Sequence, residues 1–344
     1  MIFFDVTKSG GSGHRSGLLR VSARLAEELG DSMRAVSWPT WDRKRGAADW
    51  FLTAELFSEE ERLGIAEFLA TRPGRTAAIF HDAIPLKLPH ITWPQSVARH
   101  PGYMKLLARF DRVWAVSAAS RAELLGFWRW QGIENPPPVE VLALGADFVR
   151  APRVTTGDRR PRTAALVSVG ILEPRKNQAL LLDVAETLWR EGLGFELNLV
   201  GRVNPHFGRP LEKRIKAMAR VFPGLRYRAA ADDATVAALY AGARASVFPT
   251  IAEGCGLPLL ESLWQGVPCV CSDLPVLREN ADGGGCLAAA TDDRAAWLDA
   301  LRRVLTDDAL VARFRTEATT RTLPTWAAAA EKIRAALSPG LRAS

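Results

Sequence analysis

The feature that most constrains the fold is the stretch from Ser246 to Asn280. It contains an apolar run at 245–248, a loop with Gly254 and Gly256, an apolar segment with helical character, and a second apolar run at 269–272. We interpret the two runs as strands and the segment between them as a helix that begins at a glycine-rich turn. This strand, helix, strand unit predicts an α/β domain.

The glycine-rich turn predicts an anion site. Backbone N–H groups at the start of a helix lack partners inside the helix and lie at the positive end of its dipole, where phosphates bind. Two carboxylates, Glu253 and Glu261, bracket the turn with seven residues between them. Carboxylates would repel a bare phosphate, but they can hold hydroxyls while the amides hold phosphates, which favours a sugar nucleotide. Alternatively, the two acids are ordinary residues near a helix start.

The pattern Glu-Gly-x-Gly-Leu-Pro-x-x-Glu, followed by Gly-x-Pro-x-x-x-Ser, resembles the motif of retaining glycosyltransferases of family 4, which have the GT-B fold. The resemblance implies that the first glutamate contacts the transferred sugar, the glycine turn meets the diphosphate, and the second glutamate binds the ribose. Carried over, the residues are Glu253, the turn Gly254, Cys255, Gly256 with the adjoining Leu257, and Glu261.

A second cluster is expected after a predicted strand at 164–169, where Gly170 is followed by Ile-Leu-Glu-Pro-Arg-Lys-Asn. Cations at a strand-to-helix turn, here Arg175 and Lys176, can neutralise a diphosphate leaving group. A solvated pair is the alternative, although a helix dipole disfavours cations at this end.

The same segment departs from the resembled family at one position. The family has an arginine directly after the glycine, whereas this chain has Ile171. One expected phosphate contact is therefore missing, and we expect Arg175 or Arg202 to supply it. The latter follows a predicted strand at 195–200.

In the first half of the chain, a predicted strand at 76–80 ends in His81 and Asp82. Polar residues at the carboxyl end of a parallel strand face the ligand crevice. The resemblance places this histidine beside the transferred sugar, and it places Ser117, at the end of a strand starting at Asp111, at the cleft. The alternative for the first pair is a cap that orders the following loop.

A glycine-rich segment starting at Lys8 follows the predicted first strand. Such a turn lets a ligand approach the backbone closely, although the strict G-x-G-x-x-G spacing is absent. The resemblance implies cleft or acceptor contacts for Gly13, His14, Arg15 and Gly17. A loop without function is the alternative.

The segment from Trp38 to Phe57 carries Trp38, Trp41 and Trp50 with three basic residues among them. We expect an irregular, exposed insertion around a short strand. Exposed tryptophans stack on sugars or lie at a bilayer interface, so acceptor or membrane contact is one interpretation and structural packing the other.

The chain of 344 residues has room for two α/β domains. A polar stretch with prolines and a glycine predicts a linker at 151–162, between an acceptor-side domain at 1–150 and a nucleotide-sugar domain at 163–324. Residues 325–344 are expected to form a helix that crosses back to the first domain. The expected architecture is GT-B, with two Rossmann-like domains facing each other across a cleft.

The four cysteines, at 255, 269, 271 and 286, lack the spacing of a metal site, and we expect reduced thiols and a cytoplasmic chain. We expect Cys269 and Cys271 to point to opposite faces of their strand. The chain has a formal charge of +7. Its sequence lacks the runs of basic residues with interleaved stacking aromatics that nucleic-acid binders carry, so no nucleic-acid partner is expected. No apolar run reaches membrane-spanning length, which leaves peripheral contact with the inner face of the membrane.

These expectations combine in a retaining hexosyltransferase of bacterial surface polysaccharide or O-antigen synthesis. The resemblance implies a nucleotide-sugar donor, with GDP-mannose narrowly ahead of UDP- and dTDP-sugars, and an oligosaccharide or polyprenyl-linked acceptor. No cofactor or metal is expected, because cations and a helix start can do the electrostatic work. The alternatives are a non-catalytic sugar-nucleotide-binding protein, a GT-B nucleotide-sugar epimerase and a Rossmann oxidoreductase.

Overall fold

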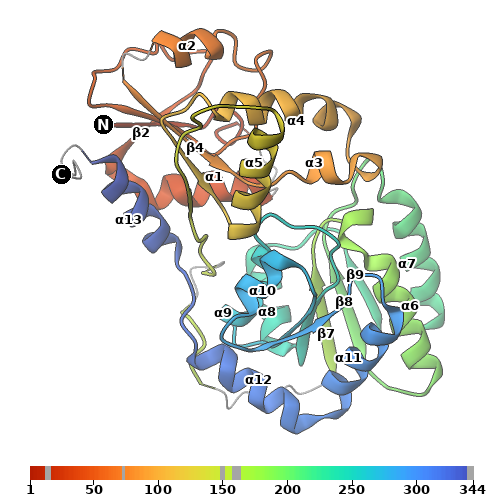
Figure 1. Ribbon diagram of the computed structural model, residues 1–344. Coiled ribbons are helices and arrows are strands. Elements are labelled where there is room, and N and C mark those ends of the chain that lie inside the picture. The colour runs from red at the N-terminus through yellow and green to blue at the C-terminus, as the bar shows by residue number, and fades with distance from the viewer. Residues whose placement is uncertain (12–16, 72–73, 148–151, 157–163, 339–344) are drawn as a thin grey trace. The chain divides into compact units, whose positions relative to one another are not determined.

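The computed structural model describes residues 1–11, 17–71, 74–147, 152–156 and 164–338. The chain divides into two units (Figure 1). The first comprises Met1–Gly145 together with Pro324–Ser344, and the second comprises Ala146–Leu323. The predicted linker at 151–162 lies mostly outside the described residues, while the last helix belongs to the first unit.

The first unit contains a parallel sheet in the order β2-β1-β3-β4-β5-β6. Its strands are β1 (Ile2–Asp5), β2 (Met33–Val36), β3 (Trp50–Thr53), β4 (Arg75–Phe80), β5 (Arg112–Ala115) and β6 (Val139–Val141). Its helices are α1 (Gly17–Leu29), α2 (Ile65–Thr71), α3 (Ile84–Lys87), α4 (Pro94–Leu107), α5 (Ala118–Trp130) and α13 (Trp326–Leu337). The chain places β2 on one side of β1 and all later strands on the other, so the strand order reverses between β1 and β3.

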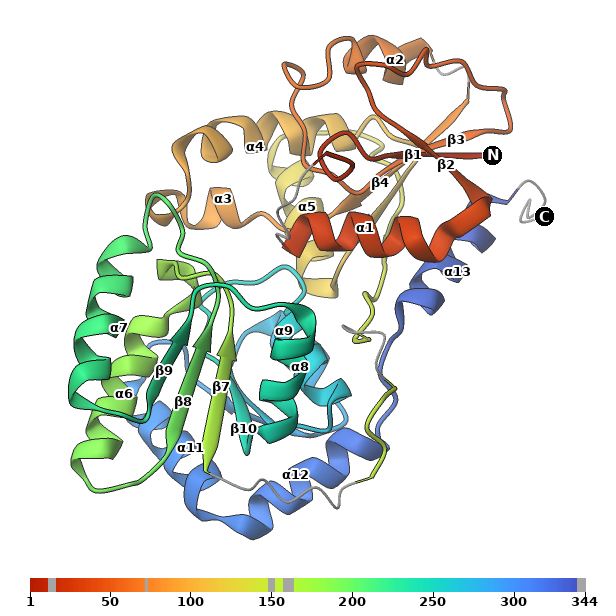
Figure 2. The same ribbon diagram turned by 180° about the vertical axis from the view of Figure 1, so that it is seen from behind.

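Both faces of this sheet are covered. On one face, Phe3 and Phe51 pack into a core with α2, α4 and α5. Their neighbours Phe4 and Leu52 are also buried and point to the opposite face, because successive strand residues alternate. Helices α1 and α13 lie side by side in both views (Figures 1 and 2).

The tryptophan-rich segment differs from expectation. Trp38 and Trp50 are buried, and Trp41 stacks on Phe51 with ring centroids 5.4 Å apart. Two of the three basic residues between them cover aromatic rings: the Arg43 guanidinium lies 4.6 Å from the Trp38 centroid and that of Arg45 lies 3.8 Å from the Phe68 centroid. An arginine can cover an aromatic face while its charge stays near water. Arginines next to tryptophans in the sequence therefore suggest an exposed segment even where the rings are buried. The prediction of an exposed insertion for sugar or membrane contact is therefore wrong.

The second unit also contains a parallel sheet, in the order β12-β11-β10-β7-β8-β9. Its strands are β7 (Ala165–Val169), β8 (Glu196–Val200), β9 (Leu225–Arg228), β10 (Ala245–Phe248), β11 (Cys269–Ser272) and β12 (Cys286–Ala289). Its helices are α6 (Gln178–Arg190), α7 (Arg209–Val221), α8 (Asp233–Gly242), α9 (Leu257–Trp264), α10 (Pro275–Ala281), α11 (Arg294–Thr306) and α12 (Asp308–Thr320), with a 3₁₀ turn, η3 (Pro174–Lys176). Here the strand order reverses between β7 and β10.

Helices α6, α7 and α11 lie on one face of the second sheet and α8 and α9 on the other (Figure 2). Neighbouring residues of β7 show the alternation, because Leu166 packs into the first layer and Val167 into the second. The cysteine expectation needs a correction. Residues two apart on a strand share a face, and the Cys271 thiol interacts with both Cys269 and Cys286. All four cysteines are free thiols.

Candidate functional site

The candidate site lies in the second unit, where the strand order reverses. In parallel α/β sheets, ligands bind outside the carboxyl ends of the strands at this point. The segment after β7 carries η3, with Arg175 and Lys176, and the segment after β10 carries Glu253. The two segments are joined by the backbone, since Ile251 N–H donates to the carbonyl oxygen of Arg175 at 2.9 Å. The structure thus brings together residues about 77 positions apart in the chain.

Three donors converge on one oxygen of Glu253. Its Oε1 accepts from Lys176 Nζ at 2.6 Å, from Arg175 Nη1 at 2.9 Å and from Thr250 Oγ1 at 2.6 Å. The other oxygen, Oε2, receives no hydrogen bond from the described residues. The carboxylate is therefore held firmly on one side and can accept a hydroxyl donor on the other.

A second carboxylate completes the charge balance of this cluster. Glu173 Oε1 lies 2.7 Å from Arg175 Nη2, and Glu173 Oε2 accepts from Asn204 Nδ2 at 3.0 Å. Arg175 also donates to the carbonyl oxygen of Ala252 at 2.8 Å. Two cations face two carboxylates, so the four side chains carry no net charge. The cations are not the solvated pair of the alternative reading.

The protonation states follow from burial and charge. Burial raises the pKa of Glu253, but the positive charges of Lys176 and Arg175, together with the hydrogen bonds, lower it by a larger amount. The pKa of Glu253 is therefore below its ordinary value, and the carboxylate is ionised. Burial lowers the pKa of Lys176, and the charge of Glu253 opposes that shift. The ammonium also lies 4.9 Å from the centroid of the Phe248 ring, a cation–π contact that stabilises its charge.

The glycine turn begins α9 as expected. Gly256 is the N-cap, with a φ of 81° that favours glycine. A Cβ atom there would lie 2.5 Å from Leu277 Cδ2, so a side chain has no room. Asn280 Nδ2 donates to the Cys255 carbonyl oxygen at 2.5 Å and fixes the turn from the side of α10. Burial, reinforced by nearby carboxylates, raises the pKa of the Cys255 thiol to about 12, which keeps it neutral.

The remaining predicted donor residues take different positions. Glu261 is buried in α9, only 2% exposed, and Leu257 is the first residue of that helix. Gly170 lies beside Gly201, where a Cβ would lie 1.9 Å from the Gly170 carbonyl oxygen. Arg202 is exposed and does not join the cluster around Glu253. Of the two arginines expected to replace the one missing at Ile171, only Arg175 lies beside Glu253.

Three predicted residues of the first unit, His81, Asp82 and Ser117, lie just after the ends of β4 and β5. His81 is buried, and its Nε2 donates to the Ala54 carbonyl oxygen at 2.7 Å. Burial lowers its pKa, which keeps the ring neutral. Ser117 caps α5 and, through a hydrogen bond of 3.0 Å, reaches Ser120 Oγ, which donates to the His81 carbonyl oxygen at 2.7 Å.

Asp82 orders the loop that follows β4, as the alternative supposed, although the N-cap of α3 is Ala83. Its Oδ1 accepts from the N–H of Ile84 at the start of α3, at 3.0 Å. Gly17 is the first residue of α1. Gly13, His14 and Arg15 lie outside the described residues.

Sequence reasoning missed four side chains that shape the site: Glu173, Thr250, Asn204 and Asn280. Glu173 stands in the same short motif as Arg175, and its position two residues before a cation was a usable signal. The two asparagines come from other loops, so only the folded chain brings them to the site. Among the described residues, no group of three or more His, Cys, Asp or Glu side chains is arranged to hold a metal ion. None of the described helices is both long and apolar enough to span a bilayer.

Comparison with known proteins identifies the second unit. Residues 163–307 match the family model described as Glycosyl transferases group 1. This part of the chain is a group 1 glycosyl transferase domain. It contains Glu253, Arg175 and Lys176, and so the whole charge cluster.

Curated relatives of the chain include mannosyltransferases. The serotype-specific mannosyltransferase WbdA of Escherichia coli is 31% identical over 246 residues, which are 67% of this chain and 29% of that protein. O-antigen chain mannosyltransferase B of Escherichia coli is 41% identical over 68 residues, 20% of this chain and 18% of that protein. The chain thus spans less than a third of the length of these relatives.

Solved structures share the fold over nearly the whole chain. WaaG, a glycosyltransferase involved in lipopolysaccharide biosynthesis, has a TM-score of 0.67 at 16% identity, covering 99% of this chain and 100% of that one. HepE of Anabaena, solved with UDP and glucose, has a TM-score of 0.68 at 14% identity, covering 98% of both chains. The group 1 domain and the parallel-sheet first unit together have the GT-B fold.

Proposed function

We propose that this chain is a retaining glycosyltransferase that moves a hexose, mannose in the first instance, from a nucleotide-sugar donor to a glycan acceptor. The observation that carries the proposal is the convergence of Arg175, Lys176 and Thr250 on one oxygen of Glu253, beside the glycine turn that begins α9. The cluster lies in the group 1 glycosyl transferase domain. The mannosyltransferase relatives support mannose as the sugar. We propose GDP as the leading nucleotide.

Each part of the site has a distinct task in this proposal. Glu253 uses its second oxygen to accept a hydroxyl of the transferred sugar. The amides of 254–256 and the start of α9 hold the diphosphate, and Glu261 binds the ribose. Lys176 and Arg175 stabilise the charge that develops on the diphosphate as it leaves.

The reaction is a front-face substitution. The acceptor hydroxyl attacks the anomeric carbon from the face that the diphosphate leaves, so the configuration is retained. The bond between the anomeric carbon and the phosphate oxygen breaks, and the acceptor proton passes to the departing diphosphate. The products are the new glycoside and the nucleoside diphosphate. The first unit contributes neutral His81 to sugar binding, and an oligosaccharide or polyprenyl-linked acceptor binds on that unit.

We further propose that turnover requires no metal and that the protein works in the cytoplasm, at the inner face of the membrane. Lys176, Arg175 and the amides at the start of α9 supply the positive potential that a divalent ion supplies elsewhere. Turnover in excess EDTA should equal turnover without it. A loss that Mg²⁺ or Mn²⁺ restores would contradict this part of the proposal.

Thermal stability in the presence of UDP, GDP, dTDP and CDP tests the donor site. A nucleotide at about a hundred times its dissociation constant adds roughly 2.7 kcal/mol, which raises the midpoint by several degrees. We expect GDP to stabilise the wild type and Glu261→Ala to lose the response. No response to any nucleotide would contradict the proposal.

Turnover separates the remaining alternatives. A transferase releases GDP from GDP-mannose faster when octyl α-D-mannopyranoside or another mannose-terminated acceptor is added. An epimerase converts the nucleotide sugar without any acceptor. A binding protein shows the nucleotide response but neither reaction, and its ligand affinity survives loss of Glu253.

A further inference from the structure

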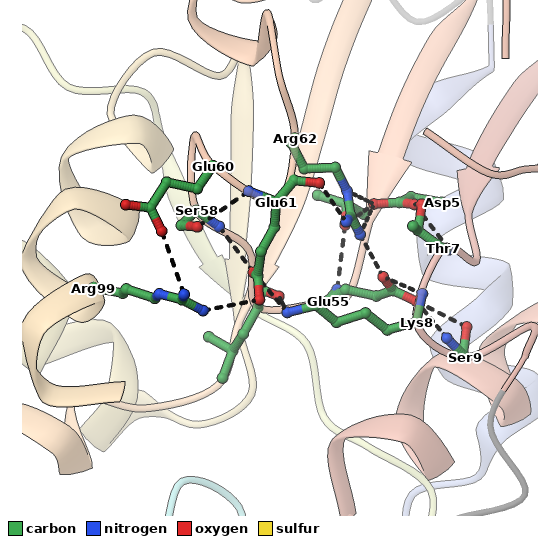
Figure 3. Close-up of polar contacts among 12 residues, drawn as sticks. Asp5, Thr7, Lys8, Ser9, Glu55, Ser58, Glu60, Glu61, Arg62 and Arg99 are labelled. Carbon is green, nitrogen blue, oxygen red and sulfur yellow. Dashed lines mark hydrogen bonds and ion pairs between the residues drawn. The ribbon is translucent and has the colours of Figure 1, made fainter. Parts of the chain in front are cut away.

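The first sheet has its own reversal point, between β1 and β3, and a buried charge cluster occupies it (Figure 3). Asp5 ends β1, Glu55 lies two residues beyond the end of β3, and Arg62 lies shortly before α2. The side chains of Asp5 and Glu55 are 1% exposed and that of Arg62 is 2% exposed. Charged residues are rarely this buried unless they are paired, and reversal points are where α/β sheets bind ligands.

One guanidinium serves both carboxylates. Arg62 Nη2 lies 3.1 Å from Asp5 Oδ2 and 2.6 Å from Glu55 Oε2. Asp5 is further satisfied by Thr53 Oγ1 at 3.0 Å and by the N–H of Thr7 at 3.1 Å. Burial and the charge of Asp5 raise the pKa of Glu55, while the N–H groups of Lys8 and Ser9 lower it.

Both carboxylate oxygens of Glu55 accept hydrogen bonds from the backbone of the glycine-rich segment. The N–H of Lys8 lies 2.9 Å from both of its oxygens, and the N–H of Ser9 lies 2.8 Å from Oε1. Ser9 Oγ adds a third donor at 3.0 Å. The turn is closed by the N–H of Gly10, which donates to the Val6 carbonyl oxygen at 2.7 Å. The carboxylate therefore sets the backbone course at the entry to this segment.

The same strand end also holds the predicted sugar-contacting histidine. Ala54, directly before Glu55, accepts the hydrogen bond from His81 Nε2 at 2.7 Å. Two consecutive residues after β3 thus hold two other parts of the unit. Ala54 positions the imidazole ring of His81, and Glu55 positions the main chain of Lys8 and Ser9.

We infer that Glu55, with Arg62 as its counterion, is a positioning residue for glycan acceptor binding on the first unit, an inference that rests on the proposed transferase function. Glu55 orders the start of the glycine-rich segment, whereas His81 is held separately by the carbonyl oxygen of Ala54. A pair serving only the core would not need to aim both carboxylate oxygens at main-chain N–H groups of a loop.

The variant Glu55→Gln tests this role, because an amide has one acceptor oxygen and one donor nitrogen. In one orientation the nitrogen faces the N–H groups of Lys8 and Ser9, and in the other it faces Arg62. A donor faces a donor in either case, so the anchor is weakened while the volume is kept. Glu61→Gln is the matched control, since Glu61 pairs with Nζ of Lys8 at 2.8 Å and leaves the main chain of the segment untouched.

The measurements are the KM for octyl α-D-mannopyranoside, the KM for GDP-mannose, and hydrogen exchange of the peptide that contains Lys8 and Ser9. For Glu55→Gln we expect the acceptor KM to rise at least tenfold, the donor KM and the stabilisation by GDP to stay within twofold, and the two amides to exchange at least tenfold faster. Glu61→Gln should match the wild type in all of these.

The outcomes separate this inference from the proposed function. Equal loss for donor and acceptor, or an unchanged acceptor KM, overturns the positioning role. If the wild type transfers no sugar, the proposed function fails and exchange alone decides whether Glu55 anchors the segment; unchanged exchange overturns the anchor too. If Glu55→Gln does not fold, Ser9→Ala removes one donor to the same carboxylate without leaving a buried charge unpaired. We then expect a two- to fourfold higher acceptor KM at unchanged thermal stability, and no change would overturn the inference.

Discussion

Glu253, whose side chain is 9% exposed, stays charged because three donors meet one of its oxygens. The shorter of its two ion pairs joins Oε1 to Lys176 Nζ, at 2.6 Å. The variant Lys176→Met keeps the length of the side chain and removes the charge, while Arg175 and Thr250 still hold the carboxylate. We expect turnover to fall about 10²- to 10³-fold, because one preorganised cation is lost from the leaving-group side. We expect the free energy of unfolding to fall by about 1–3 kcal/mol.

Steady-state turnover and urea unfolding check both numbers. Lys213→Met is the control, since that lysine is exposed on α7 and should change neither. If turnover stays within threefold of wild type while stability falls, Lys176 supports the fold and has no part in the chemistry.

The lowered pKa of Glu253 also predicts how stability depends on pH. Its ordinary pKa is about 4.3, and the folded protein holds it lower. Between the two values the unfolded chain binds more protons, so the stability that ionised Glu253 contributes is present above about pH 4.3 and is lost as pH falls through the folded value. The stability gap between wild type and Glu253→Gln should therefore be widest at neutral pH and shrink in acid. Urea unfolding from pH 3.5 to 7.5 measures it, and a gap that widens toward acid would contradict the assigned direction.

Most of the residue-level site was predictable because its members sit in two short motifs. Each motif follows a strand, and parallel strands bring their carboxyl ends to the same edge of the sheet. The pairing within the site was not predictable in this way. The cations were expected to neutralise a diphosphate, and no carboxylate partner was predicted for them, whereas Glu173 and Glu253 balance Arg175 and Lys176. Spacing along the sequence does not predict which side chains of two different loops form hydrogen bonds or ion pairs with each other.

At the scale of elements, the start of α9 depends on the one backbone conformation that Gly256 supplies. An alanine there would meet a positive φ of 81° and Leu277 Cδ2 at 2.5 Å. We expect Gly256→Ala to lower the free energy of unfolding by about 2–4 kcal/mol, which combines the left-handed conformation with overpacking. It should also weaken GDP binding, because the amides of the turn shift.

Gly242→Ala is the control from the same unit. Nothing lies within 4 Å of its added Cβ, and we expect a change within about 0.5 kcal/mol. Denaturant unfolding and the thermal response to GDP check both variants. Equal stability of the two would mean that the turn relaxes freely and does not set the donor site.

Strands and helices followed from periodicity where a face is uniformly apolar, as in β7, β10 and α13. The prediction of an exposed segment was wrong at Trp38 and Trp41, because the basic residues that follow them in the sequence suggested contact with solvent. In the structure Arg43 lies over Trp38, and Trp41 stacks on Phe3 at 5.2 Å. A guanidinium that covers a ring is invisible to a pattern that counts polar neighbours.

At the scale of the whole molecule, the chain returns at its end to the unit where it began. Helix α13 packs beside α1, Lys332 Nζ donates to the Val141 carbonyl oxygen at 2.7 Å, and Arg334 Nη1 donates to the Glu28 carbonyl oxygen at 2.9 Å. The apolar period of residues 326–337 predicted this helix, whereas its return to the first unit was predicted from the resemblance to GT-B enzymes and not from the period. Stability of the first unit therefore depends on both ends of the sequence.

This arrangement predicts which unit each core mutation weakens. Ile333 in α13 and Ile215 in α7 are both fully buried, in different units. Truncation of either to alanine should cost about 2–5 kcal/mol, and two domains with separate cores can unfold in separate transitions. We expect calorimetry to show two transitions, of which GDP raises only that of the second unit. Ile215→Ala should lower the GDP-responsive transition, whereas Ile333→Ala should lower the other and leave the GDP shift intact. A single transition lowered equally by both variants would mean that the two units unfold as one cooperative body, with the nucleotide stabilising the entire chain.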